Sequence, residues 1–361
     1  MGFGACGISI LKYSPAGSKP SEAQAFLLLS RAESRNSGLI FINSLRSLHS
    51  SHFLSSMISR RSFITTSLGA LGASSLSAIE PINRAGKSRM QLGVAAYSFR
   101  EKFQWSRGKE QKSKDGEKMW SILDFIDWCA DNNVPGAEVT SYFFPPDVDE
   151  KFLLEVKRHA YLRGVQLAGT AVGNNFALPK GEERDKQIAD VKRWIDYSAI
   201  MTAPHIRVFA GQPPKNTPEE EALANCQAAY QECLDYAATK GVFLGLENHH
   251  GLVAHPENLI RLMKGANSPW AGINWDSGNF HTEDPYGDLE KIAPYAINVQ
   301  LKMEITRLDE KVKEPSDVDR VIKILTDANY QGWFTLEYEV KNTDPFVEIP
   351  KILDMLRPKL A

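Results

Sequence analysis

The chain has 361 residues, enough for one large domain or two small ones, and its 42 Lys plus Arg nearly balance its 44 Asp plus Glu. From residue 79 onward the counts are 35 and 42, so this larger part is acidic and a nucleic acid is a poor partner for it. Three of the four cysteines lie there, Cys129, Cys226 and Cys233. The last two, spaced seven apart on one expected helix, lie about 10 Å apart and cannot pair. We expect three buried thiols rather than a disulfide framework.

Residues 57–78 read MISRRSFITTSLGALGASSLSA and differ in composition from the rest of the chain. Two arginines, Arg60 and Arg61, precede an apolar stretch that ends in small residues, a pattern that resembles a twin-arginine export signal. The apolar stretch is far shorter than the roughly 20 residues of a membrane helix, so we expect no permanent membrane anchor. Cleavage near Ala78 would release the remainder into the periplasm.

Residues 1–56 show neither helical nor strand periodicity and carry few charges. A signal preceded by so long a segment would be unusual, so we expect an unstructured leader, or a true start at Met57. The twin-arginine route exports proteins that are already folded and often loaded with a cofactor. A metal bound in the cytoplasm is compatible with that route.

From residue 79 to residue 361 the sequence repeats a short apolar strand followed by an amphipathic helix. The expected strands are Gln91–Ala96, Gly136–Thr140, Val165–Thr170, His205–Phe209, Val242–Glu247, Ala271–Trp275, Ile297–Leu301 and Trp333–Glu337. Eight strictly alternating units predict an α/β fold, a single (β/α)8 TIM barrel. The alternative is an open doubly wound sheet, which we disfavour because no glycine-rich phosphate loop follows the first strand.

The helix ends carry their own signals, most clearly in the segment NTPEEEALANCQAAYQECLDYAATKG. We expect Thr217 to cap this helix, Pro218 to occupy its first turn and Glu220 to complete a capping box. Gly241 is expected to adopt the left-handed conformation after the last turn. The last helix opens in a similar way, with an Asp and a Pro at positions 344 and 345.

In such a barrel the chemistry lies at the carboxyl ends of the strands, where residues with reactive side chains gather on strands five to eight. They are Glu247, Asn248, His249 and His250; Asp276, Asn279 and His281; Gln300, Lys302 and Glu304; and Glu337 and Glu339. Buried carboxylates are costly unless they are paired or bound to a cation. The convergence of Glu247, Asp276 and Glu337 therefore implies a divalent metal, with the side-chain oxygen of Gln300 nearby.

Further residues at this mouth are candidates for binding substrate. Arg207 and Glu138 are expected to hold substrate hydroxyls or to lie just behind the site, and Arg207 is equally consistent with a buried ion-pair partner of a glutamate. Lys302 is placed to polarise a substrate oxygen. Asn279, at the end of strand six, is also assigned to the substrate.

The histidines divide less clearly between function and structure. His249 shares the inward face with Glu247 by the two-residue period, whereas one of the two adjacent histidines is expected to be structural. His281 follows its strand, as a loop residue near the substrate or a solvated one. The charged stretch RGKEQKSKDGEK is most simply a solvated loop, but its place after strand one allows a lid, with Phe99 and Trp105 over the substrate.

Short segments spread along the chain resemble the sugar-phosphate isomerase/epimerase family of xylose-isomerase-like TIM barrels. They are AYSF, GAEVT, HIRVFAG, LGLENHHG, NWDSGN, VQLK and LEYE. The resemblance implies one metal held by Glu, Asp, His and Glu from strands five to eight, with the two glutamates also acting as acid and base. Residue by residue this implies Glu247, Asp276 and Glu337 as ligands and Glu247 and Glu337 as catalytic groups.

The sequence departs from that family on strand seven, where Gln300 replaces the usual His and Met303 replaces the Asp that commonly follows the Lys. With Gln300 the ligand set is all oxygen, which favours Mn2+ or Mg2+, whereas an imidazole would suit Zn2+ or Co2+. We expect a metal-dependent isomerase or epimerase that acts on a small-molecule sugar, a free sugar or keto-sugar, through an enediolate. No glycine-rich phosphate site follows strand eight, which favours an unphosphorylated sugar or an oxidised glycoside.

Three alternatives remain open. A dehydratase or lyase would use the same residues, and an exported barrel that binds a sugar without a metal would explain the weaker ligand Gln300. The AP endonucleases share this barrel type but bind several metals through many histidines, and residues 79–361 contain six. No sequence feature predicts an oligomeric state.

Overall fold

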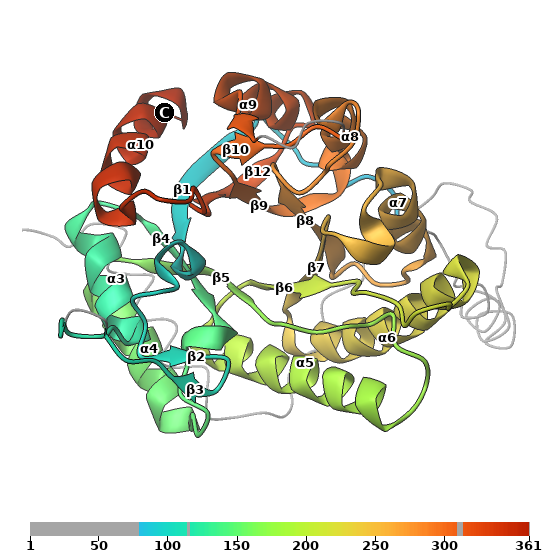
Figure 1. Ribbon diagram of the computed structural model, residues 1–361, viewed down its shortest axis with the longest axis horizontal. Helices are drawn as coiled ribbons and strands as arrows, with labels where there is room; N and C mark the ends of the chain where they lie inside the picture. Colours follow the sequence, from blue (N-terminus) through green and yellow to red (C-terminus); the bar gives the residue numbers. More distant parts are fainter. Residues whose placement is uncertain (1–78, 114–115, 309–312, 361) are drawn as a thin grey trace, which may run out of the picture. The chain divides into compact units, whose positions relative to one another are not determined.

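The computed structural model describes residues 79–113, 116–308 and 313–360. The expected leader and twin-arginine signal lie outside the described residues. Within the described part, parallel strands close into a barrel in the order β1-β12-β9-β8-β7-β6-β5-β4. Figure 1 shows the strands at the centre and the helices around them. The predicted (β/α)8 barrel is confirmed.

All eight predicted strands form, with ends that differ from the prediction by at most two residues. They are β1 (Arg89–Ala95), β4 (Gly136–Thr140), β5 (Gln166–Ala171), β6 (His205–Phe209), β7 (Phe243–Glu247), β8 (Ala271–Asp276), β9 (Ala296–Leu301) and β12 (Gln331–Leu336). Strands of a parallel sheet are covered on both faces, so their near-continuous apolar runs are expected. Every residue of β4 and β8, for example, is buried.

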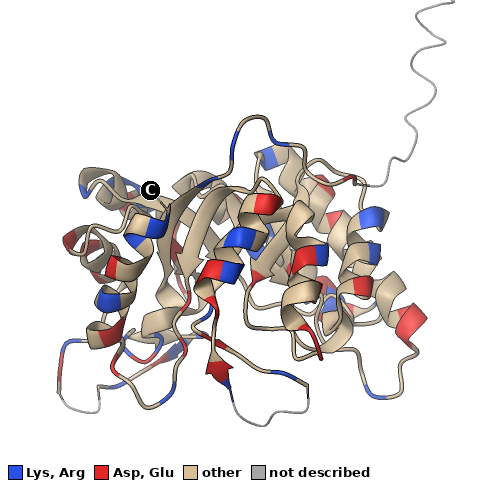
Figure 2. Ribbon diagram, turned by 90° about the horizontal axis from the view of Figure 1, so that it is seen from above, with Lys and Arg blue, Asp and Glu red and all other residues tan. Residues whose placement is uncertain are grey.

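A helix follows each strand of the barrel and packs on its outside. The helices are α3 (Ile122–Asp131), α4 (Glu150–Leu162), α5 (Glu182–Met201), α6 (Glu219–Lys240), α7 (Pro256–Gly265), α8 (Pro285–Ile292), α9 (Val318–Asp327) and α10 (Pro345–Leu360). Polar atoms at this interface find partners: Trp275 Nε1 donates to the Leu289 carbonyl at 3.0 Å, and Tyr230 Oη donates to the Leu244 carbonyl at 2.8 Å. Figure 2 shows that charges of both signs are interspersed along the outer helices.

Short elements lie in the loops at the carboxyl ends of the strands. They are the 3-10 turns η1 (Ala96–Phe99), η2 (Ser141–Phe143) and η3 (Gly251–Val253), the hairpin of β2 (Trp105–Ser106) with β3 (Lys109–Glu110), and the pair β10 (Glu304–Ile305) with β11 (Glu314–Pro315). A further 3-10 turn, η4 (Ala293–Tyr295), connects α8 to β9. No helix within the described ranges is long and apolar enough to cross a membrane.

The predicted capping box at the start of α6 is wrong. Pro218, with an extended ψ of 141°, is itself the N-cap, and no side chain caps the helix. Glu220 instead accepts a hydrogen bond from Arg261 on α7, at 2.7 Å from Nη1 to Oε1. A guanidinium can donate two charge-assisted hydrogen bonds to a carboxylate, whereas a capping box provides one backbone N–H. The end of α6 is as predicted, since Gly241 has a φ of 69°.

The three cysteines are fully buried and free, as the sequence predicts. The inside of the barrel, in contrast, is partly polar. A Cβ at Gly169 would lie 2.0 Å from the ring of His205, so only glycine lets this imidazole fill the barrel beside β5. The imidazole of His205 on β6 thus packs against the neighbouring β5 inside the barrel.

Candidate active site

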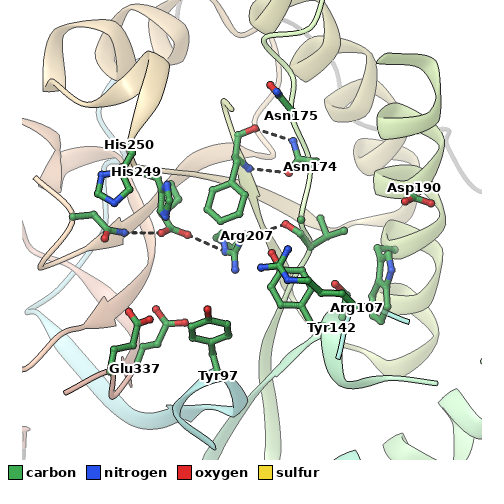
Figure 3. A pocket seen from close by; sticks show the side chains of 18 of the residues that line it. Tyr97, Arg107, Tyr142, Asn174, Asn175, Asp190, Arg207, His249, His250 and Glu337 are labelled. Atoms are coloured by element: carbon green, nitrogen blue, oxygen red, sulfur yellow. Dashed lines mark hydrogen bonds and ion pairs between the residues drawn. The ribbon is translucent and has the colours of Figure 1, made fainter. Parts of the chain in front are cut away.

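A cavity of about 1080 Å³ opens at the carboxyl ends of the strands. Figure 3 shows side chains that line it, with Glu337 and Tyr97 on one side, Arg207 at the centre and Asp190 on the far side. The wall between β6 and β12 carries carboxylates and cationic side chains, which we call the charged wall. It is formed by Arg207, Glu247, Lys302, Glu337 and Glu339.

Glu247 lies at the end of β7, where two neighbours fix both of its oxygens. Arg207 on the adjacent β6 places Nε 2.9 Å from Glu247 Oε2, and Asn279 Nδ2 donates to Oε1 at 2.8 Å. The Arg207 guanidinium also lies over the Phe209 ring, 4.0 Å from its centroid. Burial raises the pKa of Glu247 well above its ordinary value, Arg207 opposes the shift, and nearby carboxylates add to it.

Lys302, just after β9, reaches the other carboxylates of the charged wall. Its ammonium contacts the carboxylates of Glu337 and Glu339 and lies 3.5 Å from Asp276 Oδ2. Burial alone would lower the pKa of Lys302, but the facing carboxylates hold it well above its ordinary value. The cationic form of Lys302 is therefore stable here even though the side chain is largely out of water.

Asp276 ends β8 beneath this lysine and is completely buried. Its backbone is fixed by Asn248, whose amide both accepts from the Asp276 N–H and donates to the Asp276 carbonyl, each at 2.8 Å. Burial raises the pKa of Asp276 to about 7, with Lys302 opposing the shift. Oδ1 accepts from the Gly278 N–H, while the buried Oδ2 has no hydrogen-bond donor.

Glu138 lies beneath the cavity rather than in its lining. It is fully buried and accepts hydrogen bonds from Gln300 Nε2 at 2.7 Å and Asn298 Nδ2 at 3.0 Å. Of the two predicted places for Glu138, in contact with the substrate or just behind the site, the structure agrees with the second, because Glu138 lies in the middle of β4 rather than at its end. Burial raises the pKa of Glu138 to about 7, and the charge of Glu337 adds to the shift.

Gln300 belongs to the same buried layer, and both ends of its amide have partners. Its Nε2 donates to Glu138, and its Oε1 accepts from Asn274 Nδ2 at 2.7 Å. Asn298 Nδ2 in turn reaches Asn274 Oδ1 at 2.7 Å. The oxygen that the sequence suggests as a fourth ligand is therefore already an acceptor in the floor of the site.

The donor chemistry of the charged wall fits a divalent cation. Together with Asp276, its carboxylates outnumber its two cationic side chains by two. Burial raises the pKa of Glu247 and of Asp276, and the neighbouring carboxylates add to both shifts. Asp276 Oδ2 is a buried oxygen without a donor. Over the described ranges, however, no three His, Cys, Asp or Glu side chains form a ready cluster for a metal, and Lys302 and Arg207 contact the carboxylates instead.

Three histidines line the cavity beside the charged wall. The ring of His249 lies 4.7 Å from that of Phe209 and 4.6 Å from that of His250, and the ring of His250 lies 5.1 Å from that of His281. Burial lowers the pKa of His249 to about 3, with the charge of His250 next, so its ring is neutral at physiological pH. All three are placed to meet a ligand, including His281.

The loop after β1 reaches the cavity through other residues than the sequence suggests. Phe99 is buried in an aromatic core, 4.6 Å from Trp128 and 5.0 Å from Phe346 between ring centroids. The expected lid of Phe99 with Trp105 is therefore wrong, and Arg107 and Gly108 at the tip of the β2–β3 hairpin line the cavity instead.

The structure also adds lining residues that sequence reasoning missed. Tyr97 and Tyr142 lie in the turns directly after β1 and β4, and Asn174 lies shortly after β5. The other lining residues were found by inspecting the positions directly after each expected strand, and the same inspection after the first three strands would have found these three. Asp190 and Trp194 carry no such signal, because they lie within α5 and reach the cavity from its side.

Comparison with known proteins agrees with this geometry. The model of a protein family described as a xylose isomerase-like TIM barrel matches residues 126–359. No curated protein matches the chain. Among solved structures, a D-psicose 3-epimerase from Clostridium cellulolyticum H10, crystallised with D-tagatose, is similar with a TM-score of 0.61 and 15% identity over 75% of this chain and 99% of that one.

Two further structures show the same fold. A 3-keto-D-glucoside 4-epimerase from E. coli has a TM-score of 0.56 and 15% identity over 75% of this chain and 100% of its own. A xylose isomerase domain protein from Planctomyces limnophilus has a TM-score of 0.55 and 17% identity over 76% and 99%. At such identities the likeness establishes the barrel and its topology alone.

Proposed function

The chain belongs to the xylose isomerase-like TIM barrel family, and from that premise we propose that it is a divalent-metal-dependent isomerase or epimerase of a small-molecule sugar. The observation that carries the proposal is the convergence of three carboxylates at the mouth of the barrel, with Glu247 and Glu337 in the cavity lining and Asp276 buried beneath Lys302. The sugar epimerases among the similar structures support the same class of reaction.

A divalent ion, held by Glu247, Asp276 and Glu337, would supply charge to a sugar carbonyl and its neighbouring hydroxyl, and Mn2+ or Mg2+ suits these oxygen ligands best. The carboxylates themselves move the proton. Glu247 on β7 and Glu337 after β12 are separated by β8 and β9 around the barrel, so they approach a bound sugar from different sides. One accepts the proton from carbon, leaving an enediolate, and the other returns a proton.

The place of proton return defines the product. Return to the opposite face of the same carbon gives an epimer, and return to the adjacent carbon interconverts aldose and ketose. Loss of a β-hydroxyl from the same enediolate would make the enzyme a dehydratase. The raised pKa of Glu247 makes its protonated form easier to reach than that of an ordinary glutamate, which suits a group that both accepts and donates a proton.

The neighbouring side chains hold these carboxylates in place. Arg207 and Asn279 each bind one oxygen of Glu247, which orients the carboxylate toward the cavity. Lys302 does the same for Glu337 and presents its ammonium to a substrate oxygen that gains charge. His249, neutral and next to Phe209, offers a ring nitrogen to a sugar hydroxyl.

A metal-free sugar-binding barrel is the second candidate. It is favoured by Gln300, whose amide is committed to the floor, and by Lys302, which contacts two carboxylates of the charged wall. Metal analysis of the purified protein separates the two candidates. A stoichiometric ion together with turnover in a screen of ketoses, aldoses and keto-sugars supports the enzyme, whereas sugar binding without ion or turnover supports the binder.

We also propose that the protein is exported to the periplasm by the twin-arginine route, on the pattern of residues 57–78. Changing Arg60 and Arg61 together to Lys is then expected to retain the uncleaved precursor in the cytoplasm, as seen by fractionation. Lys87→Arg, an exposed change beyond the signal, serves as the control. Unchanged export of the double variant would contradict the proposal.

A further inference from the structure

We propose that the substrate carries a second sugar unit, joined by a glycosidic bond, which binds in the outer half of the cavity. The inference rests on the proposed function only in placing the reacting sugar unit at the charged wall; binding of the second unit does not depend on it. The outer half is lined by residues of the β2–β3 hairpin, the loops after β4 and β5, and α5. They are Arg107, Tyr142, Phe144, Asn175, Gln187, Asp190, Trp194 and Tyr197.

The size of the cavity is the first observation. At about 1080 Å³ it exceeds what a single hexose fills, since cavities of roughly 300–1,000 Å³ accommodate ligands of drug size. A disaccharide is a ligand of that size. The reacting unit needs the carboxylates of the charged wall, so a single sugar bound there would leave the outer half to water.

The outer half has the walls of a built site rather than of open surface. Tyr142, Phe144 and Trp194 are 8%, 2% and 6% exposed, and the rings of Phe144 and Trp194 meet edge to face with centroids 5.1 Å apart. Aromatic walls with a few polar groups between them are typical of sites for small ligands. These nearly covered rings form a rigid, packed backing for the outer half.

Hydrogen bonds hold the loops of the outer half in place before any ligand arrives. The Asn174 amide donates to the Phe209 carbonyl and accepts from the Phe209 N–H, each at 2.8 Å, which joins the loop after β5 to the end of β6. The Asn175 N–H donates to Gln187 Oε1 on α5 at 3.0 Å. Such a preorganised wall loses little conformational entropy when it binds a ligand.

The hairpin supplies the rim of the outer half. The Arg107 N–H donates to the Tyr142 carbonyl at 2.8 Å, and the Arg107 guanidinium lies 3.9 Å from the centroid of the Tyr142 ring. Figure 3 shows Arg107 beside Tyr142, with Asp190 farther along the same wall. The exposed N–H groups of Arg107 and the carboxylate of Asp190 are thus available to the hydroxyls of a sugar.

The outer half presents a carboxylate as well as cations. Arg107 lies against an aromatic ring, and Arg193 places Nη2 2.6 Å from Asp190 Oδ1, so a negatively charged ligand would meet the Asp190 carboxylate. A phosphate site would gather unpaired cations or helix N-terminal N–H groups. A sugar unit that is joined to a second one can still react, because its carbonyl is either at the free reducing end or is a ketone on the ring.

The test is isothermal titration of the purified, Mg2+-loaded protein with D-glucose and D-fructose against cellobiose, maltose and lactulose. We expect at least one disaccharide to bind about tenfold more tightly than its component monosaccharides. The double change Arg107→Ala with Asp190→Ala is expected to bring the ratio of the monosaccharide and disaccharide dissociation constants close to one. The matched control pairs Lys109→Ala with Glu183→Ala, exposed residues of the same hairpin and helix that do not line the cavity, and it is expected to keep the preference.

Binding to none of the disaccharides above the monosaccharides overturns the inference. So does an equal preference in the double variant and the wild type, or tighter binding of fructose 6-phosphate than of every disaccharide. The readout is independent of the proposed reaction, because Glu337→Gln is expected to keep the disaccharide preference while it loses turnover. A preference for disaccharides in a protein that turns over no sugar would support this inference and contradict the proposed function.

Discussion

The charged wall and the outer half of the cavity lie side by side at the same barrel mouth, yet they are held together differently. In the charged wall, Glu247, Glu337 and Lys302 are tied mainly to one another and to Arg207. In the outer half, Asn174 and Asn175 are tied to the backbone and to α5. Buried charges must be balanced, so the first wall responds to any change of charge, whereas the second is defined by shape.

The largest expected effect comes from the charged wall. Glu247→Gln and Glu337→Gln keep the shape of each side chain but remove a charged ligand and a base, so turnover is expected to fall at least about a hundredfold in each. Steady-state kinetics on the best substrate of the sugar screen measures it. Glu290→Gln, an exposed change on α8, is the control. Substantial activity in both variants would contradict the assigned roles.

A change of ligand type on β9 tests the metal itself. Gln300→His is expected to increase retention of Zn2+ or Co2+ about tenfold or more, because imidazole prefers these ions and the wild-type oxygen set prefers Mn2+ or Mg2+. Both proteins are loaded with a mixture of metals, dialysed and analysed for retained ions. Equal retention by the two proteins would contradict the prediction and mean that the side chain at position 300 stays in the floor of the site.

The buried carboxyl groups in and beneath the charged wall also predict how the free energy of unfolding depends on pH. The pKa of Glu138 and that of Asp276 are each raised to about 7. A carboxyl whose pKa is higher in the folded protein stabilises the fold while it is protonated. That contribution is complete below about pH 4 and is lost as the pH rises through 7.

Denaturant unfolding of metal-free protein between pH 4 and pH 8 measures this loss. Glu138→Gln removes the titration of Glu138, so the loss of stability between pH 4 and pH 8 is expected to be about 3 kcal/mol smaller. Glu150→Gln, on the exposed start of α4, should leave the slope unchanged. A steep slope that survives in Glu138→Gln would show that this carboxyl is not the group that titrates.

The outer half is expected to show the smallest effect on stability. Arg107→Ala removes an exposed cation-π contact, which contributes about 0.5–1 kcal/mol, so the free energy of unfolding should fall by no more than that at any pH. The same unfolding measurement applies. A loss of several kcal/mol would mean that the hairpin stabilises the barrel. It would contradict the difference between the charged wall and the outer half.

The sequence predicts the charged wall better than the outer half, for a physical reason. Glu247, Asp276 and Glu337 end strands whose period assigns their direction, so the barrel alone brings them together. For Glu138 the sequence leaves open a substrate contact or a place just behind the site, and its position within β4 puts it in the second place, one layer deeper than the cavity.

Arg107 and Asp190 reach the cavity through contacts between a hairpin, a loop and a helix that have no local sequence pattern. Their place depends on tertiary packing, such as the bond from the Arg107 N–H to the Tyr142 carbonyl. The prediction of a capping box at Glu220 was wrong for a similar reason, because Glu220 binds Arg261, which is distant in the sequence. Local rules hold where the barrel repeats itself and fail where one loop meets another.

Solvent deuterium uptake tests the central claim most directly, because only proton transfer to and from carbon by Glu247 and Glu337 exchanges that hydrogen with water. The Mg2+-loaded enzyme is incubated with its substrate in D2O, and the recovered sugars are analysed by mass spectrometry. We expect a deuterium on carbon in the product, with uptake lost in Glu337→Gln. Turnover that leaves the carbon-bound hydrogen unexchanged would indicate a direct hydride shift and contradict the account.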